Sequence, residues 1–133
     1  MTVQQTTTQQ TNQQEISNKE DYQTIEALLK DYFNGLYEGD VSKLRSIFHD
    51  DAWLKGNNFR KSRDEWLEAV AARPIPKEEG MDYGFNVISL DVVGDQAMAK
   101  VDVPLLAAHF IDFLGLLKED GTWKIVNKMF TII

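Results

Sequence analysis

Asp112 and Lys128 are charged residues in otherwise apolar stretches near the end of a 133-residue chain. A carboxylate and an ammonium that project together into an apolar hollow form a proton-transfer pair, a ligand anchor or a structural ion pair. Burial raises the pKa of an aspartate and lowers that of a lysine, whereas proximity of the two groups has the opposite effect on both. The pair is therefore the centre of a candidate site whose protonation stays open.

The predicted hairpin turns place both residues on one face of a sheet. Two-residue turns at Gly94-Asp95 and Ala107-Ala108, followed by a three-residue loop at residues 119–121, align four strands. The resulting row across the sheet contains Asn86, Val103, Asp112 and Lys128. The amide of Asn86 either orients a ligand carbonyl or pairs with backbone at a bulge.

Further candidates lie on a helix, after a helix and on the strands. Tyr32 belongs to the apolar stripe of the first predicted helix, as a core tyrosine or as a donor to a developing oxyanion. His49 follows the second helix, either as a cation at its C-terminal dipole or as a base at the pocket mouth. Trp53, Phe110 and Phe130 are expected to bind the ligand as part of the pocket wall.

Capping signals define the helices that must position these side chains. Capping boxes at residues 17–20 and 62–65 begin the first and third predicted helices, and Asp40 caps a shorter second one. The first helix is expected to end at Gly39 and the third to stop before Pro74.

From Tyr83 onward the apolar period changes to two, which is typical of strands. Four strands are expected over about residues 83–93, 96–106, 109–118 and 122–132, with a short extended piece at residues 52–54 before the third helix. Helices followed by an antiparallel meander predict an α+β fold. In it, three N-terminal helices pack on a curved, mainly antiparallel sheet of four to six strands.

The sheet face away from the helices also carries large apolar side chains. They are Phe85, Met98, Ile111, Phe113, Trp123, Ile125 and Met129. An exposed patch of this size usually marks a protein interface. We therefore expect a homodimer through this face.

Composition excludes several classes of function. Fourteen basic and 21 acidic residues give a net charge of -7, so binding through neutralisation of nucleic-acid phosphates is not expected. The chain has no cysteine, metal-ligand spacing or phosphate-binding glycine motif, so neither a metal nor a cofactor is expected.

Residues 1–16, rich in Gln and Thr, are expected to be a disordered tail before one domain at residues 17–133. Without a signal peptide or an apolar span, the expected location is the cytoplasm, away from membranes.

Several phrases of the sequence resemble the nuclear transport factor 2-like (SnoaL-like) superfamily. They are Tyr32-x6-Gly39-Asp40, Leu44-x2-Ile47-Phe48-His49-x-Asp51-Ala52, Ser62-Arg63-Asp64-Glu65, His109-Phe110-x-Asp112-x-Leu114-x-Leu116-Leu117-Lys118 and Gly121-x-Trp123-Lys124-Ile125-Val126-Asn127-Lys128. Within it, residues 17–132 most resemble the small bacterial group called putative lumazine-binding proteins. The resemblance implies a cone-shaped barrel, usually dimeric, with a pocket between helices and sheet. It supplies no reaction, because the superfamily includes isomerases, dehydratases, cyclases, epoxide hydrolases and non-enzymatic binders.

Ketosteroid isomerase, a member of that superfamily, offers a residue-level comparison. The resemblance places its acidic tyrosine at Tyr32 and its protonated aspartate within one residue of Asp112. The position of its general base is Gly56 in this chain. The resemblance therefore disfavours steroid isomerisation by that mechanism.

Three hypotheses of function follow. The first is a small-molecule-binding protein that holds a largely apolar or heterocyclic ligand in the cone, with its polar end at Asp112, Lys128, Asn86 and Tyr32. The second is a cofactor-free isomerase, dehydratase or cyclase in which Asp112 takes and returns a proton while Tyr32 or Lys128 stabilises an enolate. The third is a structural dimerisation module whose cone is filled by its own side chains.

Overall fold

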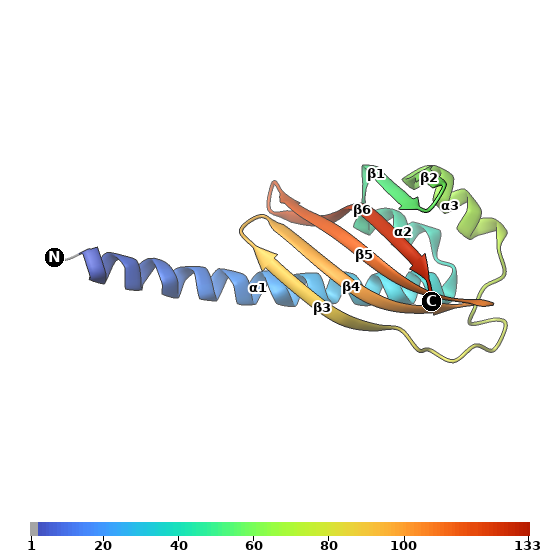
Figure 1. Ribbon diagram of the computed structural model, residues 1–133, viewed down its shortest axis with the longest axis horizontal. Helices are drawn as coiled ribbons and strands as arrows, with labels where there is room; N and C mark the ends of the chain where they lie inside the picture. Colours follow the sequence, from blue (N-terminus) through green and yellow to red (C-terminus); the bar gives the residue numbers. More distant parts are fainter. Residues whose placement is uncertain (1–2) are drawn as a thin grey trace.

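The computed structural model describes residues 3–133, and it describes side chains from Asn18 onward. The helices are α1 (Val3–Glu38), α2 (Val41–Ile47) and α3 (Arg63–Ala72). The strands are β1 (Phe48–Gly56), β2 (Phe59–Ser62), β3 (Asn86–Val93), β4 (Gln96–Leu105), β5 (Ala108–Glu119) and β6 (Thr122–Ile132), as shown in Figure 1. These elements confirm the predicted α+β class. No helix in the described part is long and apolar enough to cross a membrane.

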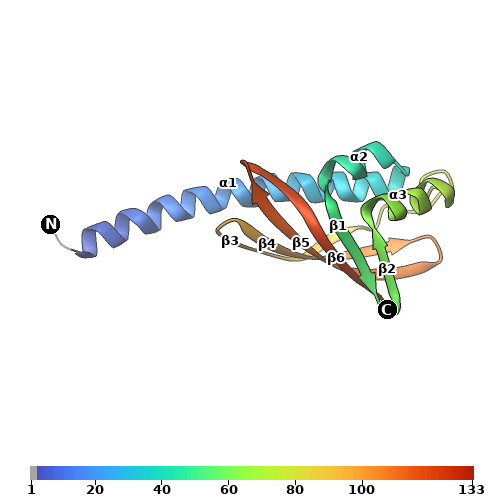
Figure 2. The same cartoon turned by 90° about the horizontal axis from the view of Figure 1, so that it is seen from above.

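The strands form one six-stranded sheet in the order β2-β1-β6-β5-β4-β3. β1 pairs with β6 in parallel, and the other neighbouring strands are antiparallel. Figure 2 shows α1 running across one face of the curved sheet, with α2 and α3 on the same side. The predicted arrangement of helices on one face of a mainly antiparallel sheet is therefore confirmed.

Residues 48–62 are more ordered than the sequence predicted. In place of a short extended piece at residues 52–54 they form the hairpin β1–β2, so the third helix follows two strands. Asn58 in the turn has a φ of 59°, which asparagine adopts more readily than most residues. The parallel pairing of β1 with β6 joins segments that are distant in the sequence, and local alternation alone does not reveal such a pairing.

The predicted end of the first helix and the predicted N-terminal caps of the second and third helices are confirmed. Asp40 caps α2 by accepting a backbone hydrogen bond at 3.0 Å, and Ser62 forms a reciprocal capping box with Glu65 at the start of α3. α1 ends before Gly39, which has a φ of +64°, and a Cβ there would lie 2.9 Å from Ile75. Both observations explain why glycine ends this helix.

The start of α1 at Val3 differs from the predicted start, so the capping box at residues 17–20 does not lie at its first turn. Residues 1 and 2 of the predicted tail lie outside the described residues, as do the side chains through Ser17. The disorder of residues 1–16 therefore stays a prediction.

The strand registers agree with the prediction at one hairpin and differ at two. Val93 pairs with Gln96 as predicted. The β4–β5 turn consists of residues 106–107, so Asp112 pairs with Val101 instead of Val103. Moving a hairpin turn by one residue shifts each pair by two residues, and Asp112 therefore keeps its predicted face.

The β5–β6 hairpin has a two-residue turn at residues 120–121 instead of the predicted three-residue loop. The shorter loop reverses the predicted faces at the start of β6, so Trp123 and Ile125 are buried rather than exposed on the outer face. A register shift between Gly115 and Leu116 then returns the rest of β6 to the predicted face. Lys128 consequently points under the helices, although its partner in the register is Leu114 and not Asp112.

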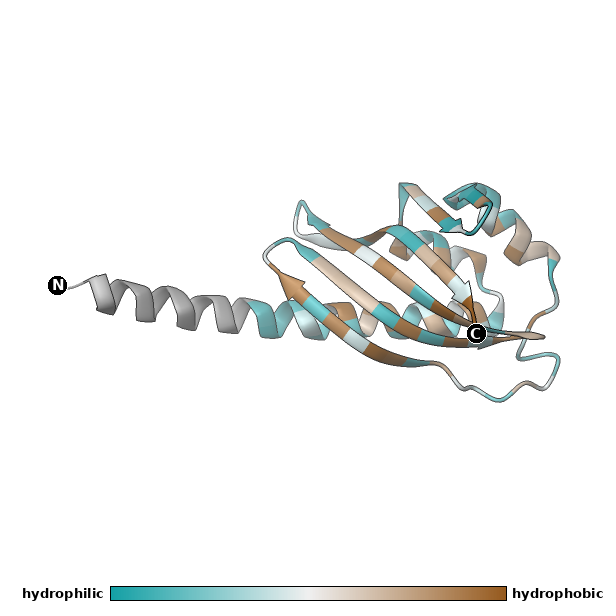
Figure 3. Ribbon diagram, in the orientation of Figure 1, coloured by the Kyte–Doolittle hydropathy of each residue, from teal (hydrophilic) through white to brown (hydrophobic). Residues whose placement is uncertain are grey.

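Two further residues differ from their predicted faces. Phe85 precedes β3 and packs against the ring of Phe33 at 5.6 Å, in the core instead of on the outer face. Ile88 lies at a register shift of β3 and is exposed instead of covered by the helices. Figure 3 shows the alternation of apolar and polar residues along the strands that the sequence predicted.

The core lies between α1 and the inner face of the sheet. The apolar stripe of α1 is buried as predicted, with Ile25, Leu29, Tyr32 and Leu36 almost completely inaccessible. Its partners on the sheet include Ala99, Val101, Val103, Leu114 and Leu116. Asp112 and Lys128 are buried within the same layer. They are charged exceptions to its apolar interior.

Candidate functional site

Asp112 and Tyr32 form a buried hydrogen bond between β5 and α1. The Tyr32 hydroxyl donates to Oδ2 of Asp112 at 2.6 Å, and both residues are at most 1% exposed. Burial, together with the adjacent Asp112 carboxylate, raises the pKa of Tyr32 well above its ordinary value of 10. Tyr32 is therefore a neutral donor that holds the orientation of Asp112.

Lys128 reaches the same carboxylate from β6. Its Nζ lies 3.7 Å from Oδ2 of Asp112, a distance typical of an ion pair rather than of a direct hydrogen bond. The ammonium also lies 4.7 Å from the ring centroid of Trp66 and 5.7 Å from that of Phe130, within the range of cation–π attraction. Burial lowers the pKa of Lys128, and the negative charge of Asp112 opposes that effect.

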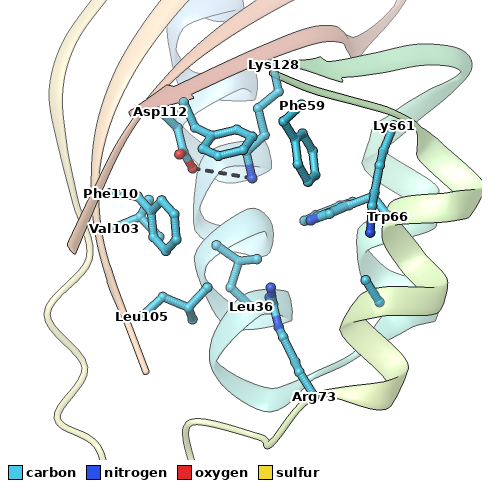
Figure 4. A pocket seen from close by; sticks show the side chains of 12 residues that line it. Leu36, Phe59, Lys61, Trp66, Arg73, Val103, Leu105, Phe110, Asp112 and Lys128 are labelled. Carbon is cyan, nitrogen blue, oxygen red and sulfur yellow. Dashed lines mark ion pairs between the residues drawn. The ribbon is translucent and has the colours of Figure 1, made fainter. Parts of the chain in front are cut away.

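A pocket of about 250 Å³ opens between these residues and α3. Its wall consists of Leu36, Phe59, Lys61, Trp66, Ala69, Arg73, Val103, Leu105, Phe110, Asp112, Lys128 and Phe130. Figure 4 shows Asp112 and Lys128 at one side of this space. Trp66 of α3 and Arg73 at the C-terminal end of α3 face them from the other side. Apolar walls with a few convergent polar groups are typical of small-molecule sites.

The structure brings together five of the eight predicted site residues. Tyr32, Asp112 and Lys128 are in contact, and Phe110 and Phe130 lie in the pocket wall. Phe130 is also the direct cross-strand partner of Asp112. Tyr32 is not itself in the wall, so it acts on the pocket through Asp112.

The other three predicted residues lie elsewhere. Asn86 pairs with Asp102 and donates to its carboxylate at 3.1 Å on the exposed side of the sheet, so the predicted row with Asp112 is wrong. Trp53 is 46% exposed on β1 and is absent from the pocket wall. The different placement of both residues follows from strand pairings that the sequence pattern did not reveal.

His49 lies at the start of β1, in a cluster with two neighbouring acids. Its Nδ1 lies 2.9 Å from Asp50 and 2.7 Å from Asp51, and all three side chains are at least partly exposed. Their ligand atoms lie close enough together to hold a metal ion, but exposed acidic groups commonly cluster without one. The cluster does not contribute to the pocket wall.

Sequence reasoning missed the contribution of α3 to the polar part of the pocket. Arg73, the C-cap residue of α3, directs its guanidinium into the pocket (Figure 4). Burial lowers the pKa of Arg73, and the neighbouring Asp112 opposes the effect. A signal was present, since Trp66, Ala69 and Arg73 are spaced to share one face of a helix.

Gly56 stands where the ketosteroid isomerase comparison would require a catalytic base, and packing explains why. A Cβ at this position would lie 2.9 Å from the ring of Phe130, closer than side chains tolerate without a shift. Because Phe130 belongs to the pocket wall, any larger residue at position 56 would have to displace it.

Comparison with known proteins agrees with this architecture. The model of the family described as "Putative lumazine-binding" matches residues 20–131. The chain belongs to this family. No curated protein matches the sequence.

Solved structures extend the family assignment to the NTF2-like fold. An NTF2-like protein of unknown function from Silicibacter pomeroyi DSS-3 is 27% identical with a TM-score of 0.74, and the match covers 87% of this chain and 98% of that one. One from Shewanella baltica OS155 is 23% identical with a TM-score of 0.77, over 86% and 94% of the two chains. One from Methylobacillus flagellatus KT is 25% identical with a TM-score of 0.72, over 86% and 93%. This member of the "Putative lumazine-binding" family therefore has the NTF2-like fold.

Proposed function

We propose that the protein binds a small, largely apolar organic molecule in the pocket between α3 and the sheet. The observation that carries this proposal is a pocket with four aromatic rings in its wall that reaches the buried Asp112 and Lys128. The rings of Phe59 and Phe110 meet that of Phe130 edge-on, at 5.0 and 5.8 Å between centroids. Such a wall favours a flat ring with a polar end.

The volume of the pocket limits the size of the ligand. A cavity of roughly 150 Å³ is enough for benzene, and this pocket measures about 250 Å³. One ring or two fused rings therefore fit, which is the size of the heterocycle in the family's description. We infer that a mono- or bicyclic aromatic or heterocyclic compound occupies the site.

A variant that fills the pocket tests this proposal. Ala69→Phe places a ring in the wall of the pocket, whereas Ala71→Phe adds the same ring at an exposed position of α3. Native mass spectrometry of freshly purified protein should show a small molecule retained by the wild type and by Ala71→Phe, and lost from Ala69→Phe. Equal retention by all three proteins would place the ligand outside this pocket.

An isomerase or lyase that needs no cofactor is a second candidate function. The position of Asp112 in the pocket wall favours it, because a proton-transfer group must reach the reacting atom. In this function Asp112 is the acid and base, Lys128 stabilises the developing negative charge, and Tyr32 positions Asp112. If Asp112→Asn retains affinity for the retained compound but no longer converts it, the protein is an enzyme. If wild type leaves the compound unchanged, it is a binder.

A purely structural module is less well supported, because the pocket is open to a ligand as far as Asp112.

We also propose a homodimer through the outer sheet face, over a patch smaller than the sequence indicated. Met98 and Met129 are about half exposed, and Phe113 lies between their strands as the partner of Met129. Lys100 and Asp102 on β4 bring opposite charges to the same region, and a twofold contact, which places a patch against its own copy, would let such charges pair between subunits.

A further inference from the structure

The charge of the pocket is opposite in sign to the charge of the protein. The whole chain has a net charge of -7, with 14 basic and 21 acidic residues. Its pocket wall nevertheless contains Lys61, Arg73 and Lys128 against the single carboxylate of Asp112. A cationic hollow in an acidic protein attracts anions selectively to that place.

The carboxylate of Asp112 does not neutralise all of these cations. It already accepts the hydrogen bond of Tyr32 and pairs with the ammonium of Lys128. Lys61 is half-buried, and its Nζ lies 5.4 Å from the ring centroid of Phe59. The positive charge of Arg73 therefore stays without an anionic partner among the residues that the structure describes.

Arg73 also has an unused donor. Its Nη2 is buried and has no hydrogen-bond partner in the described part of the chain. A buried donor without an acceptor is costly, and the cost is greater when the group is charged. Figure 4 shows the guanidinium pointing into the space toward Lys128 and Asp112, so a ligand in the pocket is in position to supply the missing acceptor.

We infer that the ligand of this pocket is an aromatic carboxylate, whose two oxygens bind the guanidinium of Arg73 and whose ring lies among Phe59, Trp66 and Phe130. The inference rests on the proposed function and adds the chemical class of the ligand. The planar fork of a guanidinium matches a carboxylate in two parallel hydrogen bonds. The three aromatic side chains supply the flat apolar surface that the ring needs.

Matched acids and amides test the inference directly. The probes are 2-naphthoate with 2-naphthamide and indole-3-carboxylate with indole-3-carboxamide, titrated into the wild-type protein by isothermal calorimetry at pH 7. Each pair has nearly the same shape and differs in charge. We expect each acid to bind roughly tenfold to a hundredfold more tightly than its amide, the ratio expected for hydrogen bonds to a charged group.

Two arginine variants locate the effect. Arg73→Gln removes the proposed partner, and Arg45→Gln removes the same charge from an exposed ion pair between α2 and α3 that is outside the pocket wall. The preference for acid over amide should disappear in Arg73→Gln and persist in Arg45→Gln, and in Arg73→Gln the affinity for the amides should fall much less than the affinity for the acids. Thermal unfolding of each variant verifies that it is folded. The comparison of acid and amide on the wild type needs no variant at all.

The possible results separate the two proposals. Equal binding of acid and amide by the wild type overturns the inference about charge and leaves the proposed apolar ligand site intact. A preference for the acids that survives in Arg73→Gln also overturns it, because another group must then hold the anion. If none of the four compounds binds, both the proposed function and the inference fail.

Discussion

Tyr32 connects α1 to the sheet through a hydrogen bond to a carboxylate that is almost completely buried. Removing the hydroxyl of Tyr32 takes away this hydrogen bond and leaves Asp112 paired with Lys128 alone. We expect Tyr32→Phe to lower the free energy of unfolding by about 1–3 kcal/mol, measured by urea denaturation at pH 7. Tyr83→Phe is the control, since the hydroxyl of Tyr83 donates to Asn34 at an exposed position. An equal loss in both variants would contradict the special role of Tyr32.

The raised pKa of Tyr32 predicts how stability depends on alkaline pH. The folded protein keeps the phenol proton at pH values where the unfolded chain, with a tyrosine pKa of about 10, releases it. The stabilisation is therefore fully present below about pH 10 and is lost as the pH rises further. Tyr32→Phe lacks this contribution, so its free energy of unfolding should fall less steeply between about pH 9.5 and 11. Parallel pH profiles of the two proteins would rule the effect out.

The attachment of α1 to the strands depends on Asp21. One carboxylate oxygen accepts from Nε1 of Trp123 at 3.0 Å and from Nζ of Lys118 at 3.1 Å. Burial acts to raise the pKa of Asp21, but the two hydrogen bonds and the charge of Lys118 outweigh it, and the pKa is lower than usual. The helix is thus held at the β5–β6 hairpin by an ionised carboxylate.

Asp21→Ala should lower the free energy of unfolding at pH 7 by about 1–3 kcal/mol, because the buried indole N–H of Trp123 loses its acceptor. The carboxylate contributes above the unfolded pKa of about 3.9, and the contribution is lost as the pH falls through the lower folded pKa. The difference between wild type and variant should therefore narrow in denaturation experiments below about pH 4. Glu20→Ala, at an exposed neighbouring position, is the matched control. If the free energies of unfolding of wild type and Asp21→Ala differ by the same amount at all pH values, the ionised carboxylate is not the source of the stabilisation.

The first residues of the chain are expected to add little to this attachment. Residues 2–14 contain six Gln and five Thr, which offer little apolar surface to bury. Deleting residues 1–14 should therefore leave the melting temperature almost unchanged in a calorimetric scan. A large decrease would show that this segment packs against the domain.

Association of two copies is the prediction that concerns the molecule as a whole. If the outer face of the sheet forms the interface, sedimentation at micromolar concentration should show a dimer. The double variant Met98→Lys with Met129→Lys should be monomeric, because it buries two charges at the proposed contact. Ala71→Lys, on the exposed side of α3, should stay dimeric. A monomeric wild type would contradict the interface.

Much of this architecture was predictable because its signals are local. The caps at Asp40 and Ser62 act over three or four residues, and the period of the α1 stripe reflects a helix packed on one side. The face of Asp112 was also predictable, because alternation survives a hairpin shift of two residues. Tyr32 and Asp112 could therefore be assigned to one neighbourhood from the sequence alone.

The rest depended on contacts between distant segments. A two-residue turn followed by a register shift set the faces of β6, so Trp123 entered the core while Lys128 kept its predicted side. Asn86 lies on the outer face because a register shift between Val87 and Ser89 changes the pairing at the start of β3. Arg73 lies in the pocket wall because α3 packs over the edge of the sheet that β1 and β2 form. The strand registers and the helix packing depend on the apolar surface buried throughout the core. A local sequence pattern does not determine that total burial.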